Sequence, residues 1–321
     1  MIDYIKLRIS KDNWELIRDN LQGKLNVKYN PKDGRVLYTA YKLETFEIRL
    51  YSMHIDIAGS IHSFHNRING ISEDNRDDFS HEEFRIAVEK LEEMIGIELR
   101  LETLTQVEMG VNLQVGFHAK NFLRQNILMW DFDRPIVDED KGERGHFKEF
   151  KTSQFYIKTY DKGRQLQLGY EEMRLELKYI RSPYFRALGI RNLNDLMDHS
   201  KFKILARDLF QRLNNDLLIV DTVDVSFIKD RKDHQLLTQG MNAVYWEQLN
   251  TEPSRHNKKH KKPIHPMTVS RRKNAYIKLL YKYDLMKRKA LVMALLREKI
   301  YELSGVGVSV NGKLHTFSHI K

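Results

Sequence analysis

The segment from Phe155 to Tyr160 carries the side chains with the clearest chemical potential. Its residues are mostly aromatic or β-branched, which favours a strand. Successive side chains of a strand point to opposite faces, so Tyr156, Lys158 and Tyr160 share one face. A tyrosine hydroxyl next to an ammonium group can serve nucleophilic or acid–base chemistry. Tyrosines and charges are also common on ordinary sheet faces, so both interpretations stay open at this point.

Two further strands are predicted to bring acids and bases to such a face. Glu108 and Asn112 point together within the run from Thr105 to Val115, and Gly110 lies between them. Arg174, Glu176 and Lys178 alternate with leucines in the run from Met173 to Ile180. If the three strands are neighbours, one surface presents carboxylates, cations and tyrosines. Oxygen-rich sets of ligands suit Mg²⁺ or Mn²⁺.

The elements that must position these residues follow from hydrophobic periodicity. A Ser-x-x-Glu capping box at Ser80 precedes apolar positions at helical spacing and predicts a helix from Ser80 to Ile95. Alternation of apolar and polar residues predicts strands at Met1 to Ser10, Val36 to Lys42 and Phe46 to Ala58. One early helix is predicted at Lys11 to Leu21.

The second half of the chain is predicted to be mostly helical. The predicted elements are helices at Asn192 to Asn215, near His234 to Leu249, at Thr268 to Tyr283 and at Asp284 to Leu303, with Gly305 as a C-terminal stop. We therefore predict an α+β fold, in which an antiparallel sheet has helices mainly on one face and precedes a mostly helical C-terminal domain. The length favours two domains, which we expect at 1–205 and 206–321.

The positive charge of the chain is concentrated near its C-terminal end. The whole chain carries +10, and thirteen Lys or Arg oppose two acids between Thr251 and Ala290. Such a stretch favours a polyanionic partner, although a solvated lysine-rich tail is the simpler alternative. The candidate DNA-binding residues are Lys258, Lys259, Lys261, Lys262, Arg271, Arg272 and Lys273.

Composition limits the remaining classes of function. The chain has no cysteine, which excludes disulfides, thiolate metal sites and a cysteine nucleophile. No apolar run approaches the roughly 18–20 residues that cross a bilayer, and the N-terminus lacks the pattern of a signal peptide. We therefore expect a soluble protein of the bacterial host cytoplasm with no membrane partner.

Several of these segments resemble the rolling-circle replication initiators of filamentous phages, the gene II and gene X family, and more distantly those of staphylococcal plasmids. The similarity runs from Met1 to about His199. It rests on five pieces in the family's order: Met1-Ile2-Asp3 with the alternating strand that follows, Ala58-Gly59-Ser60-Ile61-His62-Ser63-Phe64, Gln106-Val107-Glu108-Met109-Gly110-Val111-Asn112, Tyr156-Ile157-Lys158-Thr159-Tyr160-Asp161-Lys162-Gly163, and Arg174-Leu175-Glu176-Leu177-Lys178 with the segment from Tyr184 to Ile190.

The resemblance implies a site-specific endonuclease and strand transferase with an HUH-nuclease-like catalytic domain. The family's nucleophile is a tyrosine two residues before a lysine, which matches Tyr156 and Lys158. Tyr160 is the rival, but it lies roughly 13 Å along the strand, too far to serve the same phosphate. Lys158 is expected to steady that phosphate and Arg174 to hold a neighbouring one.

The resemblance also implies a divalent metal, Mg²⁺ or Mn²⁺. Related nucleases bind it with two histidines that flank one hydrophobic residue, and this sequence has no such triplet. The acids that match the family's strands are Glu108 and Glu176, with Asp56 and His62 as possible additions. The implied partners are duplex and single-stranded origin DNA, a host helicase and a host polymerase.

Two functions from other classes stay open. A non-catalytic DNA-binding protein would use Thr268 to Leu303 as a helix-turn-helix, and phosphate contacts alone would explain the basic pI. An RNA-binding protein would stack bases on Tyr156 and Tyr160. Only a nicking initiator should remain covalently attached to cut DNA.

Overall fold

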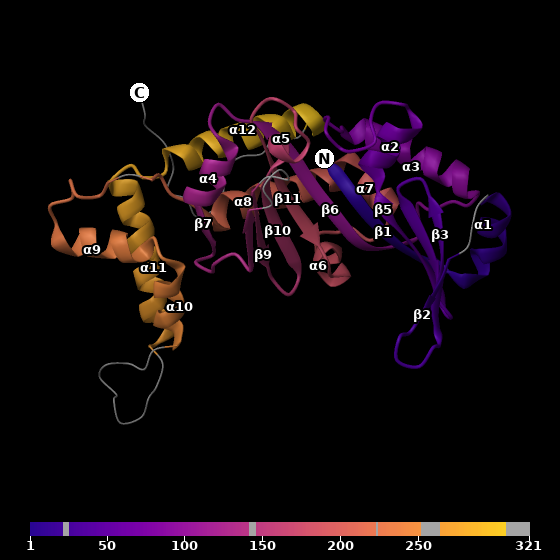
Figure 1. Ribbon diagram of the computed structural model, residues 1–321, viewed down its shortest axis with the longest axis horizontal. Coiled ribbons are helices and arrows are strands. Elements are labelled where there is room, and N and C mark those ends of the chain that lie inside the picture. The colour runs from indigo at the N-terminus through magenta and orange to yellow at the C-terminus, as the bar shows by residue number, and fades with distance from the viewer. Residues whose placement is uncertain (22–25, 141–145, 223, 252–263, 306–321) are drawn as a thin grey trace.

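A single large antiparallel sheet dominates the computed structural model (Figure 1). The structure describes residues 1–21, 26–140, 146–222, 224–251 and 264–305. The sheet has ten strands in the order β2-β3-β4-β5-β1-β6-β11-β10-β9-β8. Their bounds are β1 Ile2–Ser10, β2 Asn26–Tyr29, β3 Val36–Leu43, β4 Phe46–Leu50, β5 His54–Ser60, β6 Thr103–Gln114, β8 Val137–Asp140, β9 His146–Lys151, β10 Phe155–Asp161 and β11 Glu172–Tyr179. A separate pair joins β7 Ile127–Trp130 to β12 Leu217–Ile219.

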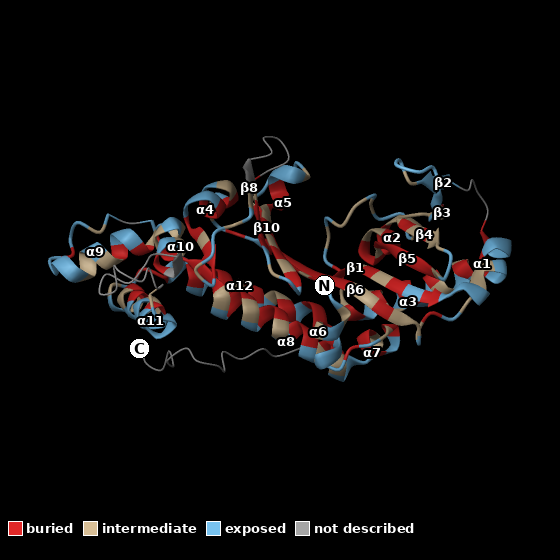
Figure 2. Cartoon of the chain, turned by 90° about the horizontal axis from the view of Figure 1, so that it is seen from below, coloured by how far each residue is buried: buried red, intermediate tan, exposed pale blue. Residues whose placement is uncertain are grey.

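Helices cover the apolar face of this sheet and build a second lobe. Their bounds are α1 Trp14–Asn20, α2 Ile61–Ile68, α3 His81–Ile95, α4 Ala119–Gln125, α5 Lys162–Gln165, α6 Ser182–Ala187, α7 Leu193–Met197, α8 His199–Asp216, α9 Arg231–Gly240, α10 Ala243–Thr251, α11 Pro266–Lys282 and α12 Lys287–Ser304. The helices α3, α8 and α12 lie along one side of the sheet (Figure 2). The fold is thus α+β with a large antiparallel sheet, as predicted.

The two faces of the central strands differ because their side chains alternate. In β6 the residues Val107, Met109 and Val111 are buried in the main apolar cluster with α8 and α12. Glu108 and Asn112 alternate with them and lie on the opposite, polar face. The β11 strand repeats the pattern, and its register places Leu177 opposite Met109. The polar side chains of neighbouring strands therefore meet on one surface.

Local sequence signals set several element boundaries. The capping box at Ser80 is present, since its hydroxyl accepts from the Glu83 backbone and Glu83 accepts from the Ser80 backbone. The predicted strand from Phe46 to Ala58 is instead two strands, because a tight turn joins Tyr51 to His54. The predicted helix from Asn192 to Asn215 is broken at Asp198, which caps α8. Gly305 ends α12 in the left-handed conformation, as predicted.

The apolar side chains form two clusters. The larger one fills the space between the sheet and the helices α3, α8 and α12, and it includes Leu296 and Ile300. The smaller one joins Trp246, Tyr276 and Leu280 in the lobe of α9, α10 and α11. The predicted division at residue 205 falls inside α8 and stays a prediction, and a fragment ending there would uncover the face that α12 covers. Among the described helices, none is both long enough and apolar enough to span a membrane.

The buried Lys289 of α12 generates a test of this packing. Its ammonium donates to the Leu217 carbonyl at 2.9 Å, and burial lowers its pKa to about 8. Below pH 8 the charge is present in both states, so the folded state carries the full cost of burying it. That cost disappears as pH rises from about 8 toward the unfolded value near 10.4, because the folded state loses its proton first.

We expect Lys289→Met to raise the free energy of unfolding at pH 7 by about 1–3 kcal/mol, with the gain shrinking toward pH 10. Urea unfolding at both pH values measures it. The matched control is Lys287→Met, since Lys287 is exposed on the same helix and should change little. A loss of stability in Lys289→Met at pH 7 would show that the Leu217 hydrogen bond outweighs the buried charge.

Candidate active site

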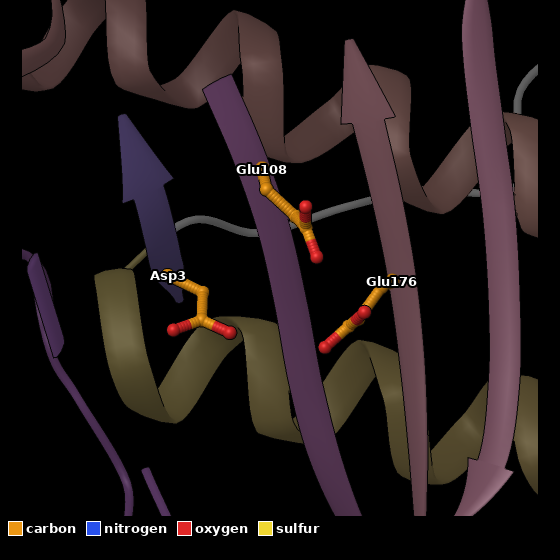
Figure 3. Close-up of side chains that lie close together, drawn as sticks. All are labelled: Asp3, Glu108 and Glu176. Carbon is orange, nitrogen blue, oxygen red and sulfur yellow. The ribbon is translucent and has the colours of Figure 1, made fainter. Parts of the chain in front are cut away.

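Three buried carboxylates meet on the polar face of the sheet. Asp3 of β1, Glu108 of β6 and Glu176 of β11 each offer an oxygen, and these oxygens lie within 4.8 Å of one another. Figure 3 shows the three side chains converging in front of the central strand β6. Among the described residues this is the group of acids and histidines close enough to hold one metal ion.

Asp3 reaches this face because of an irregularity in β1. Ile2 pairs with Met109 and Tyr4 pairs with Glu108, so two residues of β1 oppose one step of β6 and Asp3 is the extra residue. Such a bulge re-aims a side chain relative to strict alternation. Without it, Asp3 would share the apolar face of Ile5 and Leu7. A carboxylate at a position that alternation assigns to the apolar face was therefore the signal for Asp3 in the sequence. Our sequence analysis did not use it.

Arg174 holds the acids in place. Its guanidinium donates to Asp3 Oδ2 at 2.9 Å, to Asn112 Oδ1 at 2.7 Å and to Glu176 Oε1. The side chain is 3% exposed. These contacts give Arg174 a positioning role toward the acids, and its predicted contact with a DNA phosphate stays a prediction. Asp3 also accepts from Ser60 at 2.9 Å and from Asn75 at 2.8 Å.

Two lysines neutralise the remaining carboxylate oxygens. Lys158 Nζ lies 3.0 Å from Glu108 Oε1 and 3.6 Å from Glu176 Oε2, and Lys178 Nζ lies 3.1 Å from Glu108 Oε2. Burial and the adjacent charge of Glu176 raise the pKa of Glu108 to about 7. Burial opposes ionisation of Glu176 as well, but Arg174 and Lys158 outweigh it and lower the pKa of Glu176 to about 2. The cations therefore favour the ionised form of Glu176 more strongly than that of Glu108.

Gly110 makes the close packing of these side chains possible. A Cβ at this position would lie 2.8 Å from Glu176 Cγ and 2.9 Å from an Arg174 guanidinium nitrogen. Real Cβ atoms do not approach so closely, so any larger residue would push the acid and its cation out of position. The glycine that the sequence places between Glu108 and Asn112 is thus part of the site.

The two candidate tyrosines occupy different environments on β10. The Tyr160 hydroxyl donates to Glu176 Oε1 at 2.8 Å, and burial raises its pKa well above 10. The Tyr156 ring is half-buried and lies under Lys151 Nζ at 5.3 Å. Tyr156 pairs across the strands with Lys178, which itself pairs with Glu108. Tyr156 is therefore two cross-strand steps from Glu108, whereas Tyr160 contacts Glu176 directly, and both side chains are half-buried.

Asp56 and His62 have partners other than the three acids. Asp56 lies on β5 and is paired with Lys6 at 2.8 Å and with Arg8 at 3.0 Å. His62 is buried in α2, where its Nε2 contacts Asp77 at 2.9 Å and its ring stacks on Phe79. Neither belongs to the group that Asp3, Glu108 and Glu176 form.

Lys162 also lies near the site, and, as with Asp3, our sequence analysis assigned it no role. It is buried at the start of α5 and donates to Asn75, the same side chain that donates to Asp3. Burial and the charge of Arg174 lower the pKa of Lys162 to about 8. The segment from Tyr156 to Gly163, which resembles the phage initiators, includes this lysine, but only the fold brings it close to Asp3.

Three of the predicted DNA-binding residues lie on α11, which is well apart from the strands β1, β6 and β11 that carry the acids (Figure 1). Arg271 and Arg272 are exposed on α11, whereas Lys273 donates to the Asp131 carbonyl at 3.2 Å and covers the Phe132 ring. The other four predicted residues lie outside the described part of the chain: Lys258, Lys259, Lys261 and Lys262.

The donor set fits a hard divalent cation. It consists of carboxylate oxygens alone, which suit Mg²⁺ or Mn²⁺ and not zinc or copper. The acids come from three adjacent strands, with Glu108 and Glu176 at paired positions and Asp3 at the bulge of β1.

Comparisons with known proteins leave the family open. No family model matches the chain, and no curated protein matches it. Among solved structures the chain is similar to one titled "Structure of Rolling Circle Replication Initiator Protein from Geobacillus stearothermophilus". The identity is 12%, the TM-score is 0.37, and the match covers 72% of this chain and 90% of the other. We draw no conclusion about function from a likeness at this level.

Metal binding is testable without any assay of activity. We expect Asp3→Asn and Glu176→Gln each to weaken Mn²⁺ binding by more than the roughly 10–100-fold that loss of an outer-sphere partner costs, because each removes an anionic oxygen. Calorimetric titration measures the affinity, and thermal unfolding checks that each variant is folded. Asp56→Asn is the control and should bind as the wild type does. Unchanged affinity in Asp3→Asn would exclude Asp3 from the ligand set.

Proposed function

We propose that this protein is a rolling-circle replication initiator that nicks one DNA strand and later rejoins it. The observation that carries the proposal is the buried group of Asp3, Glu108 and Glu176 on the same sheet face as Tyr156 and Lys158. A buried set of oxygen ligands near a half-buried tyrosine suits phosphodiester transfer. All five residues belong to motifs that resemble the phage initiators, and Asp3 lies in the opening one.

In this proposal Asp3, Glu108 and Glu176 hold Mg²⁺ or Mn²⁺. When bound, such an ion neutralises charge that develops on a phosphate. Lys158 would place its ammonium near the same phosphate, since it already contacts two of the acids. Arg174 and Gly110 keep the acids in position. The proposed site therefore differs from the histidine-based sites of related HUH nucleases, and its likeness to them in fold is part of this proposal.

We propose Tyr156 as the nucleophile. Its oxygen would form a bond to phosphorus as the bond from phosphorus to the 3′ oxygen breaks, and the phenol proton would end on the freed 3′ hydroxyl. The 5′ end is then stored as a phosphotyrosine, and attack by another 3′ hydroxyl reverses the step and closes a single-stranded circle. Tyr160 is less suited, because its hydroxyl already donates to Glu176.

The partners follow from this chemistry. The freed 3′ hydroxyl is a primer for a host polymerase, and strand separation requires a helicase. We propose that the exposed cations of α11, with the basic residues before it, contact the duplex origin. The packing of α12 against the sheet does not favour the helix-turn-helix alternative, because residues such as Leu296 and Ile300 bury one side of that helix.

The covalent intermediate is the direct test of the proposed function. We expect the wild type, with Mn²⁺, to remain attached to a supercoiled plasmid that carries the DNA encoding and flanking this chain, even after SDS treatment. Tyr156→Phe should lose the adduct and the nick while it binds DNA nearly unchanged, because only the nucleophilic oxygen is lost. EDTA should prevent the reaction in the wild type.

Tyr160→Phe is the matched variant for this test, because it removes a hydroxyl four residues along the same strand. We expect it to retain measurable adduct. Normal nicking by Tyr156→Phe together with none by Tyr160→Phe would transfer the nucleophile to Tyr160. Full activity in EDTA would contradict the metal-dependent mechanism.

Duplex binding by α11 makes a separate prediction. We expect Arg271→Gln with Arg272→Gln, in the full chain, to lower the slope of log affinity against log salt by about 1.8, since each lost phosphate contact lowers it by about 0.9. Binding to duplex DNA at several salt concentrations measures the slope. The control is Arg85→Gln with Lys90→Gln on α3, where both cations are exposed and paired with acids. If the slope of log affinity against log salt is the same for the two double variants, the basic stretch is a solvated surface.

A further inference from the structure

The polar face of the sheet continues well beyond the three acids. Glu108 pairs with Tyr4 of β1, and the same face passes through Lys6 and Arg8 to Arg49 of β4. It ends at Tyr38 of β3, five strands from β11. Neighbouring strands are about 4.8 Å apart, so this distance is about 24 Å. The proposed chemistry at Glu108 and Glu176 accounts for none of these more distant side chains.

Three rings form a cluster at the far end of this face. Tyr38 and Tyr51 have ring centroids 5.2 Å apart, and Tyr51 stacks on His54 at 4.8 Å with an interplanar angle of 20°. Arg49 lies 5.4 Å from the centroid of Tyr38. The rings are half-buried, so part of each is open to solvent. Aromatic clusters that belong to a core are normally covered, and this one lies at the surface.

Cations line the face between the acids and these rings. Lys6 and Arg8 contact Asp56, and Arg49 contacts Glu47. Lys42 shares this face, because it pairs with Glu47 across β3 and β4. Four cations thus oppose two acids, which leaves a positive excess between the acids and the rings.

We infer that single-stranded DNA lies across this face, from the three acids to the cluster of Tyr38, Tyr51 and His54, with its bases stacked on the rings. Grooves that bind single strands combine positive charge along the backbone with aromatic side chains that stack on bases, and both features are present in one line here. A duplex would not expose its base faces to the rings. This path is the substrate path of the proposed function, and the direction in which the strand runs along it rests on that function.

Binding of a fluorescent oligothymidine of about 16 nucleotides, the upper end of common single-strand footprints, tests the path in EDTA, where no cleavage is expected. We expect Tyr51→Leu to weaken binding roughly tenfold, because stacking is lost while an apolar side chain remains. Tyr51→Trp should restore it. The control is Tyr301→Leu, since Tyr301 is 62% exposed on α12 on the other side of the sheet.

Salt dependence separates stacking from charge. Tyr51→Leu should leave the slope of log affinity against log salt unchanged, whereas Arg8→Gln should lower it by about 0.7, the value for one phosphate contact on a single strand. Equal affinities of Tyr51→Leu and the wild type, with an intact covalent adduct, would refute the path and leave the proposed nicking function standing. Weakened binding in Tyr51→Leu by a protein that forms no adduct with any metal would support the path and refute nicking.

Discussion

The arrangement of the polar face depends on the buried guanidinium of Arg174. Three carboxylates so close together, away from water, could not all be ionised without opposite charges among them. Arg174 contacts Asp3 on β1, Asn112 on β6 and Glu176 on its own strand, and so joins three neighbouring strands by one side chain. Lys158 and Lys178 complete the compensation at Glu108. Removal of one cation would leave a buried charge unpaired, which is why these residues act as a unit.

The sheet separates stability from chemistry by its two faces. The apolar face is covered by α3, α8 and α12, and its contacts fix the positions of the strands. The polar face uses those positions to hold acids, lysines and tyrosines at short distances. Glu108, Glu176 and Lys158 project from paired positions of the sheet, so their backbones have little freedom, which suits a site that must hold ligands within fractions of an ångström.

Positive charge has two different distributions in this protein. On the sheet, cations such as Lys158 and Arg8 are paired with carboxylates, so a phosphate must compete with an existing partner. On α11, Arg271 and Arg272 are exposed to solvent. The first arrangement favours selective contacts at defined places, and the second favours contacts that depend on salt and not on sequence. The proposed division between cleavage and duplex binding follows this contrast.

Local signals in the sequence determined much of the fold and part of the candidate site. The capping box predicted the start of α3, and Gly305 predicted the end of α12. Alternation in β6, β10 and β11 placed Glu108, Glu176 and Lys158 on a common type of face before the pairing of the strands was known. These features depend only on residues close together in the chain, which is why periodicity was sufficient to predict them.

The tertiary structure decided which residues complete the site. A bulge between Ile2 and Tyr4 turned Asp3 toward Glu176, and alternation alone assigns it to the opposite face. Asp56, a possible addition to the ligand set by its sequence context, is instead paired with Lys6 and Arg8. The hydrogen bond from the Tyr160 hydroxyl to Glu176 likewise joins two strands. Strand order, register shifts and the choice of ion partners join residues that are distant in sequence, so no local pattern contains them.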